Sequence, residues 1–322
     1  MNNSTTPLLF DVEELLPRPI ATPFYYTTHE SVVPGLSDVW LSLLTPVIAY
    51  WLYSLLFHFV DTYDLYPQGR IHESAEVVKR NRPSQGVVIR AVILEHVIQT
   101  AVGYAFMSRE EQEVRPSPAE GMQAITGSVA RAMLFALGES RAMPLLKAYG
   151  PQIVQWTYWW GIPISQFIFG MFVMDTWQYM LHRAMHTNKF LYRHLHAVHH
   201  SIYVPYAFGA LYNHPLEAFL LDTCGGVLSQ LAAGMTTRQA TLFYAISSMK
   251  TVDDHCGYNI PFDPFQMFFY NTADYHDIHH QHAGIKYNFS QPFFIHWDTL
   301  LGTAMTREQF EGRKKALPEK EL

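Results

Sequence analysis

The clearest pattern along the chain is a pair of long apolar stretches that lack charged residues. Residues 39–60 and residues 153–174 contain no Asp, Glu, Lys or Arg over 22 positions each. A helix of about 20 apolar residues crosses the hydrocarbon core of a bilayer. Aromatic residues gather towards both ends of the first stretch and at the start of the second, as they do at membrane surfaces. Both stretches are therefore predicted to be transmembrane helices.

Other apolar segments carry polar residues. Residues 91–107 include Glu95 and His96, which indicates either a span whose polar side chains face inward or an interfacial helix. Residues 216–235 and 240–249 contain Asp222 and several glycines, and we expect them to form a tight helical hairpin that enters the membrane and returns. The predicted fold class is an all-α integral membrane protein with about four or more transmembrane or re-entrant helices.

The segment 108–152 has a different pattern. Its apolar residues recur at helical spacing, and it also carries five basic residues. The periodic positions are Met122, Ile125, Val129, Met133 and Ala136. This combination predicts an amphipathic helix that lies along the membrane.

The basic residues also predict an orientation. The loop 63–86 contains four of them, whereas residues 1–38 contain only Arg18. Basic loops remain in the cytosol, so residues 1–38 are predicted to be lumenal and the loop cytosolic. Transmembrane and interfacial helices within 39–174 then return the chain to the cytosol. There we expect a catalytic domain over 175–306, which includes the membrane hairpin, and a cytosolic tail over 307–322. The basic residues of 108–152 do not fit the rule that basic loops remain in the cytosol.

Composition supports the membrane interpretation and excludes one function class. Charged residues make up 16% of the chain, below the roughly 25% of a soluble domain. The formal net charge of -6 argues against a nucleic-acid-binding protein, which would present a basic face. Two cysteines, Cys224 and Cys256, are too few for a disulfide framework and indicate free thiols.

Candidate chemistry is concentrated in the histidines. Of 17 histidines, 13 lie between His182 and His296. Most of these form three boxes with the sequences HRAMH, HAVHH and HDIHH. Residues three and four apart share one face of an α-helix, so each box is predicted to aim its imidazoles at one point. The boxes contain His182, His186, His196, His199, His200, His276, His279 and His280.

Eight imidazoles in three sets exceed the four ligands of one tetrahedral zinc ion and suit two metals. Imidazole binds Zn, Cu, Fe and Ni, so the ligand type alone leaves the metal open. The first box lacks the glutamate of the HExxH zinc proteases. His194, His282 and His296 are interpreted as structural or supporting residues. The histidines outside this region, His29, His58, His72 and His96, are read as ordinary core or surface residues.

The boxes occur in an order that resembles the membrane fatty acid hydroxylase and sterol desaturase superfamily. Within it, the chain is most similar to the sphinganine C4-hydroxylases, which make phytosphingosine. The strings DTWQYMLHRAMH, VPYAFGALYNHPLEAFLLDT, KTVDDHCGYNIPFDP, YHDIHHQ and YNFSQPFFIHWD carry this resemblance. It covers roughly residues 175–303, with a looser match upstream.

The resemblance implies a site with two iron ions, a location in the endoplasmic reticulum membrane and electrons delivered from NADPH through a separate cytochrome b5 and its reductase. It adds His255 as a ninth ligand. His214 is either a tenth ligand or a structural residue. Asp175, Asp254 and Asp277 are candidates to accept the second N–H of the ligating imidazoles, which would fix the orientation of the rings.

The implied reaction is the O2-dependent hydroxylation of sphinganine or dihydroceramide at C4. A sterol C4-methyl oxidase or an acyl desaturase would share the site and differ in substrate. A membrane zinc hydrolase would differ in metal. A metal transporter would place histidines along the spans rather than beyond their ends. The sequence leaves open whether the free base or the ceramide is the substrate.

Overall fold

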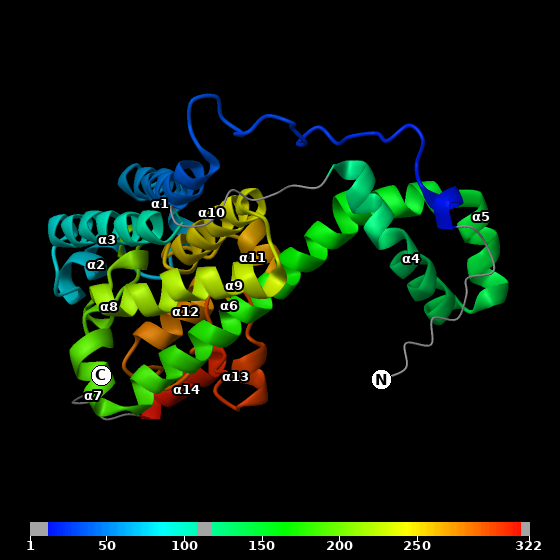
Figure 1. The fold of residues 1–322 in the computed structure, drawn as a ribbon. Coiled ribbons are helices and arrows are strands. Elements are labelled where there is room, and N and C mark those ends of the chain that lie inside the picture. Colours follow the sequence, from blue (N-terminus) through cyan, green and yellow to red (C-terminus); the bar gives the residue numbers. More distant parts are fainter. Residues whose placement is uncertain (1–11, 108–116, 317–322) are drawn as a thin grey trace. The chain divides into compact units, whose positions relative to one another are not determined.

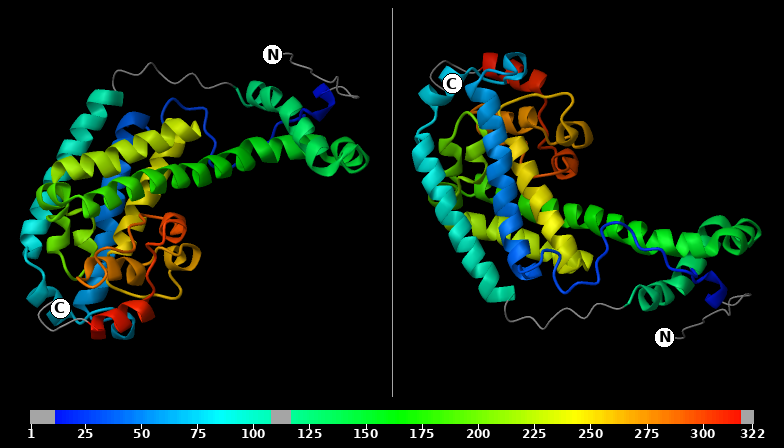
Figure 2. Two further views of the ribbon diagram at one scale, coloured as in Figure 1. Left: turned by 90° about the horizontal axis from the view of Figure 1, so that it is seen from below. Right: turned by 90° about the horizontal axis from the view of Figure 1, so that it is seen from above.

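The structure is a computed structural model that describes residues 12–107 and 117–316. These residues are helical throughout, with two isolated β-bridges and no β-strand among them. The chain divides into two compact units, the first made of Met1–Glu30 and Glu111–Ile168 and the second of Ser31–Glu110 and Phe169–Leu322. Figures 1 and 2 show the path of the chain through each unit. An all-α fold is therefore confirmed for the described residues.

The first unit is a helical hairpin with an N-terminal segment packed on it. It contains a short 3-10 helix at Val12–Leu15, α4 (Pro118–Leu137), α5 (Glu139–Trp156), a π-helical turn at Thr157–Gly161 and the start of α6 (Ile162–Thr187). A capping box between Ser117 and Glu120 begins α4, and Gly138, at a φ of 75°, separates α4 from α5. A conformation with positive φ is available to glycine at little cost, so the chain can turn sharply there.

Much of the apolar face of α4 packs against other parts of the first unit, whereas the predicted position of the segment 108–152 along the membrane stays a prediction. Met122 and Ala130 are fully buried in a cluster with Leu146, Val154 and Leu15. Ile125, Val129 and Met133 pack against the same cluster, whereas Ala136 is exposed. Periodicity identifies an apolar face but not its cover, which here is α5 and the N-terminal segment. Residues 108–116 lie outside the described residues.

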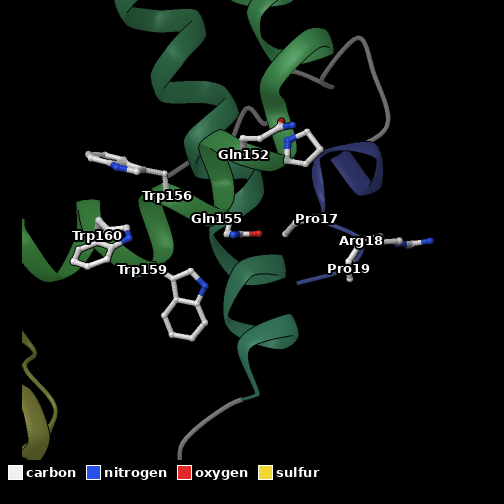
Figure 3. Close-up of a pocket in the computed structure, with 9 residues that line it drawn as sticks. Pro17, Arg18, Pro19, Gln152, Gln155, Trp156, Trp159 and Trp160 are labelled. Atoms are coloured by element: carbon white, nitrogen blue, oxygen red, sulfur yellow. The ribbon is translucent and has the colours of Figure 1, made fainter. Parts of the chain in front are cut away.

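A groove of about 370 Å³ opens on this first unit (Figure 3). Trp156, Trp159 and Trp160 line one part of it, and Pro17, Arg18 and Pro19 another. Trp159 also donates a hydrogen bond from Nε1 to the carbonyl of Ala21 over 3.1 Å, which ties the N-terminal segment to the end of α5. No histidine is among the lining residues described.

The second unit contains the remaining long helices. These are α1 (Asp38–Thr62), α3 (Gln85–Met107), the rest of α6, α9 (Cys224–Ala233) and α10 (Thr237–Asp254). Helix α1 packs along α10 and also contacts α3. Helices α1 and α3, the latter over residues 85–105, are the two among the described residues that are long and apolar enough to cross a membrane. Large side chains of α1 such as Leu52, Leu55 and Phe59 are exposed, as lipid-facing residues would be.

Short helices complete this unit and carry or flank the histidine boxes. We call these short helices and the loops between them the cap. The α-helices are α2 (Ser74–Arg80), α7 (Lys189–Leu191), α8 (Pro215–Ala218), α11 (Pro264–Phe268), α12 (Ala273–His280), α13 (His296–Leu300) and α14 (Arg307–Ala316). The 3-10 helices are Pro67–Gly69, His199–Ser201 and Ala207–Leu211, and the π-helical turns are Tyr192–His196 and Phe219–Thr223. Helices α12, α13 and α14 lie together at one side of the unit (Figure 1).

The expected hairpin and the expected third span have a more detailed structure than predicted. Residues 215–233 form α8, the π-helical turn and α9, and a turn at Gly234 leads into α10, against which α9 makes a side-chain hydrogen bond between Gln230 and Tyr244. Residues 153–174 are divided among the end of α5, the π-helical turn Thr157–Gly161 and the start of α6.

One apolar core connects the long helices to the cap. Tyr50 and Phe57 of α1, Val92 of α3 and Val252 of α10 are buried together with residues of the cap segment 202–211. The hydroxyl of Tyr50 donates to the carbonyl of Phe208 over 2.8 Å. Because this segment directly follows the second histidine box, the core fixes the box against the long helices.

The hairpin turn gives a test of the fold. Gly234 ends α9 in the left-handed conformation, with φ of 62° and ψ of 35°. We expect Gly234→Ala to lower the free energy of unfolding by about 1 kcal/mol, because a Cβ is disfavoured in this conformation. Gly234→Asn should cost less, since asparagine tolerates it. Thermal denaturation of the detergent-solubilised protein measures both changes.

Gly86→Ala is the matched control, because a Cβ there meets no other atom within 4 Å and the backbone has no positive φ. An equal loss of stability for Gly86→Ala and Gly234→Ala would contradict the assigned turn.

Candidate metal centre

The described histidines form two adjacent groups. The first group consists of His182, His186, His196, His200 and His279, and the second of His199, His255, His276 and His280. Within each group the ligand atoms all lie within 4.8 Å of one another. The structure thus brings together all eight residues of the three boxes, and with them His255. We call these groups the five-histidine cluster and the four-histidine cluster.

The two HxxHH boxes are each divided between the clusters. In the second box, His196 and His200 belong to the five-histidine cluster and His199 to the other. In the third box, His279 belongs to the five-histidine cluster, whereas His276 and His280 belong to the four-histidine cluster. The rings of His199 and His200 are inclined at 89° and those of His279 and His280 at 86°. Adjacent helical residues point about 100° apart, so the expectation that each box converges on one point is wrong for these two boxes.

The spacing between Nε2 atoms suits metal coordination. In the five-histidine cluster, neighbouring Nε2 atoms are 2.9 to 3.2 Å apart. In the four-histidine cluster the corresponding distances are 3.1 to 3.4 Å. Ligands placed about 2.1 Å from one metal ion are separated by about 3.0 Å at right angles and about 3.4 Å at tetrahedral angles. The donor sets therefore have the dimensions of two metal sites.

The boxes lie on separate elements of the chain, two on α-helices and one on a π-helical turn and a 3-10 helix. His182 and His186 lie one turn apart near the end of α6, and the third box ends α12. His196 closes a π-helical turn, and His199 begins a 3-10 helix. His255 caps the C-terminus of α10. Because these elements lie far apart in the sequence, the clusters form only when the cap is assembled on the long helices.

The second ring nitrogen of four of the nine cluster histidines is held by a backbone carbonyl. The Nδ1 atoms of His182, His255, His279 and His280 lie 2.7 to 2.8 Å from the carbonyl oxygens of Phe289, Thr251, Tyr287 and Ile202, respectively. A carbonyl can only accept, so these rings carry the proton on Nδ1 and present the Nε2 lone pair to the cluster. This is how proteins orient a metal-ligating histidine.

Glu217 supplies the one carboxylate hydrogen-bonded to a cluster histidine among the described residues. Its Oε1 accepts from Nδ1 of His196, and both side chains are buried. The sequence reasoning did not identify Glu217. The available signal was a charged residue inside an apolar segment that was expected to enter the membrane, which is a functional indicator in itself.

The three aspartates predicted for this role have other partners. Asp175 accepts from the backbone N–H groups of Phe293 and Phe294 over 3.0 and 2.6 Å. Asp254 pairs with Lys250 and accepts from Asn271. The bonds to Phe293, Phe294 and Asn271 hold α6 and α10 against loops of the cap. The two carboxylates therefore position helices and do not orient imidazole rings.

Asp277 clamps the helix that carries the third box. It accepts from Arg307 of α14 and from Gln281, and its Oδ1 lies 2.8 Å from Nε2 of His72. Burial lowers the pKa of His72, but the hydrogen bond and the charge of Asp277 outweigh it and leave that pKa raised. His72, read from the sequence as an ordinary residue, is therefore a partner of α12.

The cluster imidazoles are held in the neutral form. Burial lowers the pKa of His196 and of His255 to about 3 and that of His199 to about 4. Burial, reinforced by neighbouring imidazoles, also places the pKa values of His182 and His279 well below the usual range. Because only neutral imidazole binds a metal, the site offers nine ligands without competition from protons at neutral pH.

The other histidines of the region lie outside both clusters. His214 begins α8, where its Nδ1 accepts from the backbone N–H of Leu216 over 3.2 Å, so it is a helix cap in this structure. His194 lies against the carbonyl of Phe190, and His296 stacks on Phe172. His282 is exposed.

The donor set fits two transition-metal ions. The nine neutral imidazoles, eight of them buried and five of them oriented by a carbonyl or a carboxylate, match the ligands of iron, copper or zinc, and they do not match the oxygen-rich sites of magnesium or calcium.

Comparison with known proteins agrees with this site. A family described as fatty acid hydroxylase matches residues 167–303. A sphingolipid C4-hydroxylase of Saccharomyces cerevisiae is 46% identical over 280 residues, which cover 85% of this chain and 74% of the relative. A sphinganine C4-monooxygenase of Arabidopsis thaliana is 41% identical over 268 residues, with 83% and 88% covered.

A very-long-chain aldehyde decarbonylase of Oryza sativa is 40% identical over 269 residues, which cover 84% of this chain and 90% of the relative. No solved structure gives a significant match. The matched family region spans all three boxes and His255, and the similarity to the relatives covers more of the chain than this region does. The chain belongs to the fatty acid hydroxylase family, and within it to the group of the sphingolipid C4-hydroxylases.

Proposed function

We propose that this chain is a membrane-bound, O2-dependent oxygenase with two iron ions that hydroxylates the long-chain base of a sphingolipid at C4, converting sphinganine or dihydroceramide into phytosphingosine or phytoceramide. The observation that carries the proposal is the pair of buried all-imidazole clusters in a chain whose curated relatives are named for this reaction. Iron is the proposed metal because hydroxylation of a methylene needs redox chemistry, which zinc lacks.

Two iron ions bound here would supply the activation of O2 and the oxidising power for the C–H bond. The chain's own residues hold and protect that chemistry. Five imidazoles would bind one metal ion, and four would bind the other. Backbone carbonyls and Glu217 fix the rings, and the near-complete burial of the clusters excludes bulk water. The position of the substrate is then set by the side chains around the clusters. His214 and the three aspartates Asp175, Asp254 and Asp277 are proposed as supporting residues.

We propose that the enzyme is a multi-pass protein of the endoplasmic reticulum membrane with its site facing the cytosol. The two apolar helices α1 and α3 are the spans supported by length and composition. The segment 153–174 and the hairpin of α9 and α10 are proposed as additional spanning or re-entrant elements. Residues 1–38 would be lumenal, and residues 175–306 and 307–322 cytosolic. Electrons would come from NADPH through cytochrome b5 and its reductase, which would meet the cytosolic cap.

A second candidate activity is supported by the rice relative, which is named as an aldehyde decarbonylase and is almost as similar as the hydroxylases. This activity would act on a long-chain aldehyde at the same clusters. Sterol C4-methyl oxidation, acyl desaturation and metal-dependent hydrolysis are further outcomes against which the experiments below discriminate.

The division of the boxes between two clusters predicts how the iron content of the protein changes when one ligand is removed. We expect about two iron ions per chain, because two separate donor sets are present. His255→Ala should lower the content to about one, since it removes one of only four ligands from the four-histidine cluster. His279→Ala should abolish hydroxylation. Metal analysis of the purified protein measures the content.

His194→Ala is the control for these variants, because His194 is exposed and lies outside both clusters. One zinc ion and no iron in the unmodified protein would refute the oxygenase assignment and favour a hydrolase.

Lipid analysis tests the reaction. Expression of the chain in cells that lack C4-hydroxylated long-chain bases should restore them, and the His279→Ala variant should not. Mass spectrometry of hydrolysed sphingolipids gives the result. Restored phytosphingosine supports the proposal. Unchanged long-chain bases accompanied by a loss of long-chain aldehydes, 4-methylsterols or saturated acyl chains would reassign the enzyme.

Glycosylation tests the orientation. A lumenal N-terminus should be modified at the sequons of Asn2 and Asn3, and the double Gln variant should lose the mass shift on a gel. The sequon at Asn288 is unsuitable as a reporter, because its side chain is buried and donates to the carbonyls of Tyr275 and Met305. A sequon fused after the C-terminus serves instead, and its modification would reverse the proposed orientation.

A further inference from the structure

A small polar cavity lies beside both histidine clusters. His196 of the five-histidine cluster and His199, His255 and His276 of the other line one part of it. Its volume is about 20 Å³, which is room for one group the size of a water molecule. The remaining lining includes Gln178 and the carboxylates of Glu217, Asp222 and Asp254. It contains no lysine or arginine among the described residues, and Asp254 pairs with Lys250 outside the lining.

In Glu217 and Asp222, unlike Asp254, one carboxylate oxygen has a hydrogen-bond partner and the other has none among the described residues. Oε1 of Glu217 accepts from His196, and Oδ1 of Asp222 accepts from the amide of Gln178 over 3.1 Å. Oε2 of Glu217 and Oδ2 of Asp222 are buried and have no hydrogen-bond partner within residues 12–107 and 117–316. Glu217 is completely buried. An unpaired buried carboxylate oxygen is costly, so these atoms call for a donor that enters the cavity.

The donor that fits is a small cation with several N–H groups. An ammonium group has three donors and no acceptor and is about the size of a water molecule. It would satisfy both free oxygens and balance the negative charge. The cavity has no space for more than this group, so the rest of a ligand must continue outside it.

The proposed substrate carries an ammonium group on C2, close to the reacting carbon C4. The amino group of sphinganine is on C2, two bonds from C4, so an amine held between Asp222 and the clusters keeps C4 close to the metal sites. In dihydroceramide this nitrogen is an acylated amide that bears no charge and only one N–H.

We infer that Asp222 binds the ammonium group of the free long-chain base and makes the enzyme prefer sphinganine to dihydroceramide. The inference rests on the proposed function. Glu217 is committed to orienting His196, whereas Asp222 has no contact with a cluster histidine among the hydrogen bonds described. Asp222 is therefore the specificity-determining residue, and Glu217 is a positioning residue.

The test is the Asp222→Asn variant of the full-length protein, purified in detergent and compared with the unmodified chain. We expect unchanged iron content and a KM for sphinganine raised at least about tenfold, because a charge-assisted pair is lost. The KM for dihydroceramide should change by less than about twofold. In direct titrations, the unmodified protein should bind sphinganine more tightly than N-acetylsphinganine.

Asp263→Asn is the matched control. Asp263 is also a buried carboxylate, it does not line the cavity, and it caps α11, a role that asparagine fills equally well. It should leave both KM values unchanged.

Three results would overturn the inference. These are loss of iron in Asp222→Asn, an equal change for both substrates, and equal binding of sphinganine and N-acetylsphinganine by the unmodified protein. The last result does not depend on the folding of any variant. If the unmodified protein hydroxylates neither substrate, the proposed function fails instead, and the two failures are distinguishable.

Discussion

The need to hold nine imidazoles together in the neutral form is the constraint on which the rest of this structure depends. Neutral rings packed with their Nε2 atoms about 3 Å apart repel one another unless a metal ion accepts the lone pairs. Each ring also has an Nδ1–H that must be satisfied away from water, because buried donors without partners are costly. Carbonyls of residues 202, 287 and 289 in the cap and of Thr251 in α10 do this for four rings, and Glu217 does it for His196. Its loops are therefore part of the metal centre.

The same requirement explains why the cap is fastened so firmly to the long helices. A carbonyl orients a ring only if its own backbone is fixed. Ile202 belongs to the apolar core shared with α1 and α10, and Phe289 is held by Asp298, which is completely buried and accepts its N–H over 3.0 Å. Asp175 and Asp277 fasten α6 and α12 in the same way. Membrane-helix packing and ligand geometry are thus linked through a small number of buried polar residues.

Much of the centre could be predicted from the sequence, because side-chain type and helical spacing determine it. The three boxes and His255 lie together as the family resemblance indicated. Both HxxHH boxes are nevertheless divided between the clusters, because the two adjacent histidines of each point in different directions, which the spacing of three and four residues does not indicate. The carbonyl acceptors have no signature in the sequence, because every residue has a carbonyl. Periodicity predicted a helix around Met122 correctly, but it could not indicate that α5 would cover the apolar face.

The carboxylates around the centre fall into two sets with different electrostatic roles. Asp254 and Asp277 have cationic partners in Lys250 and Arg307, so their charge is balanced within the protein. Glu217 and Asp222 line the cavity together with Asp254, but no ion pair with a lysine or arginine is found for either of them among the described residues. A buried charge without a partner costs several kcal/mol, so a positive charge from outside the chain would stabilise the ionised form of each. Under the proposed function, metal ions bound by His196 and its neighbours would provide it for Glu217, and a cationic substrate would provide it for Asp222. The unpaired oxygens of Glu217 and Asp222 therefore affect both the stability of the protein around the cavity and the kind of ligand that the cavity accepts.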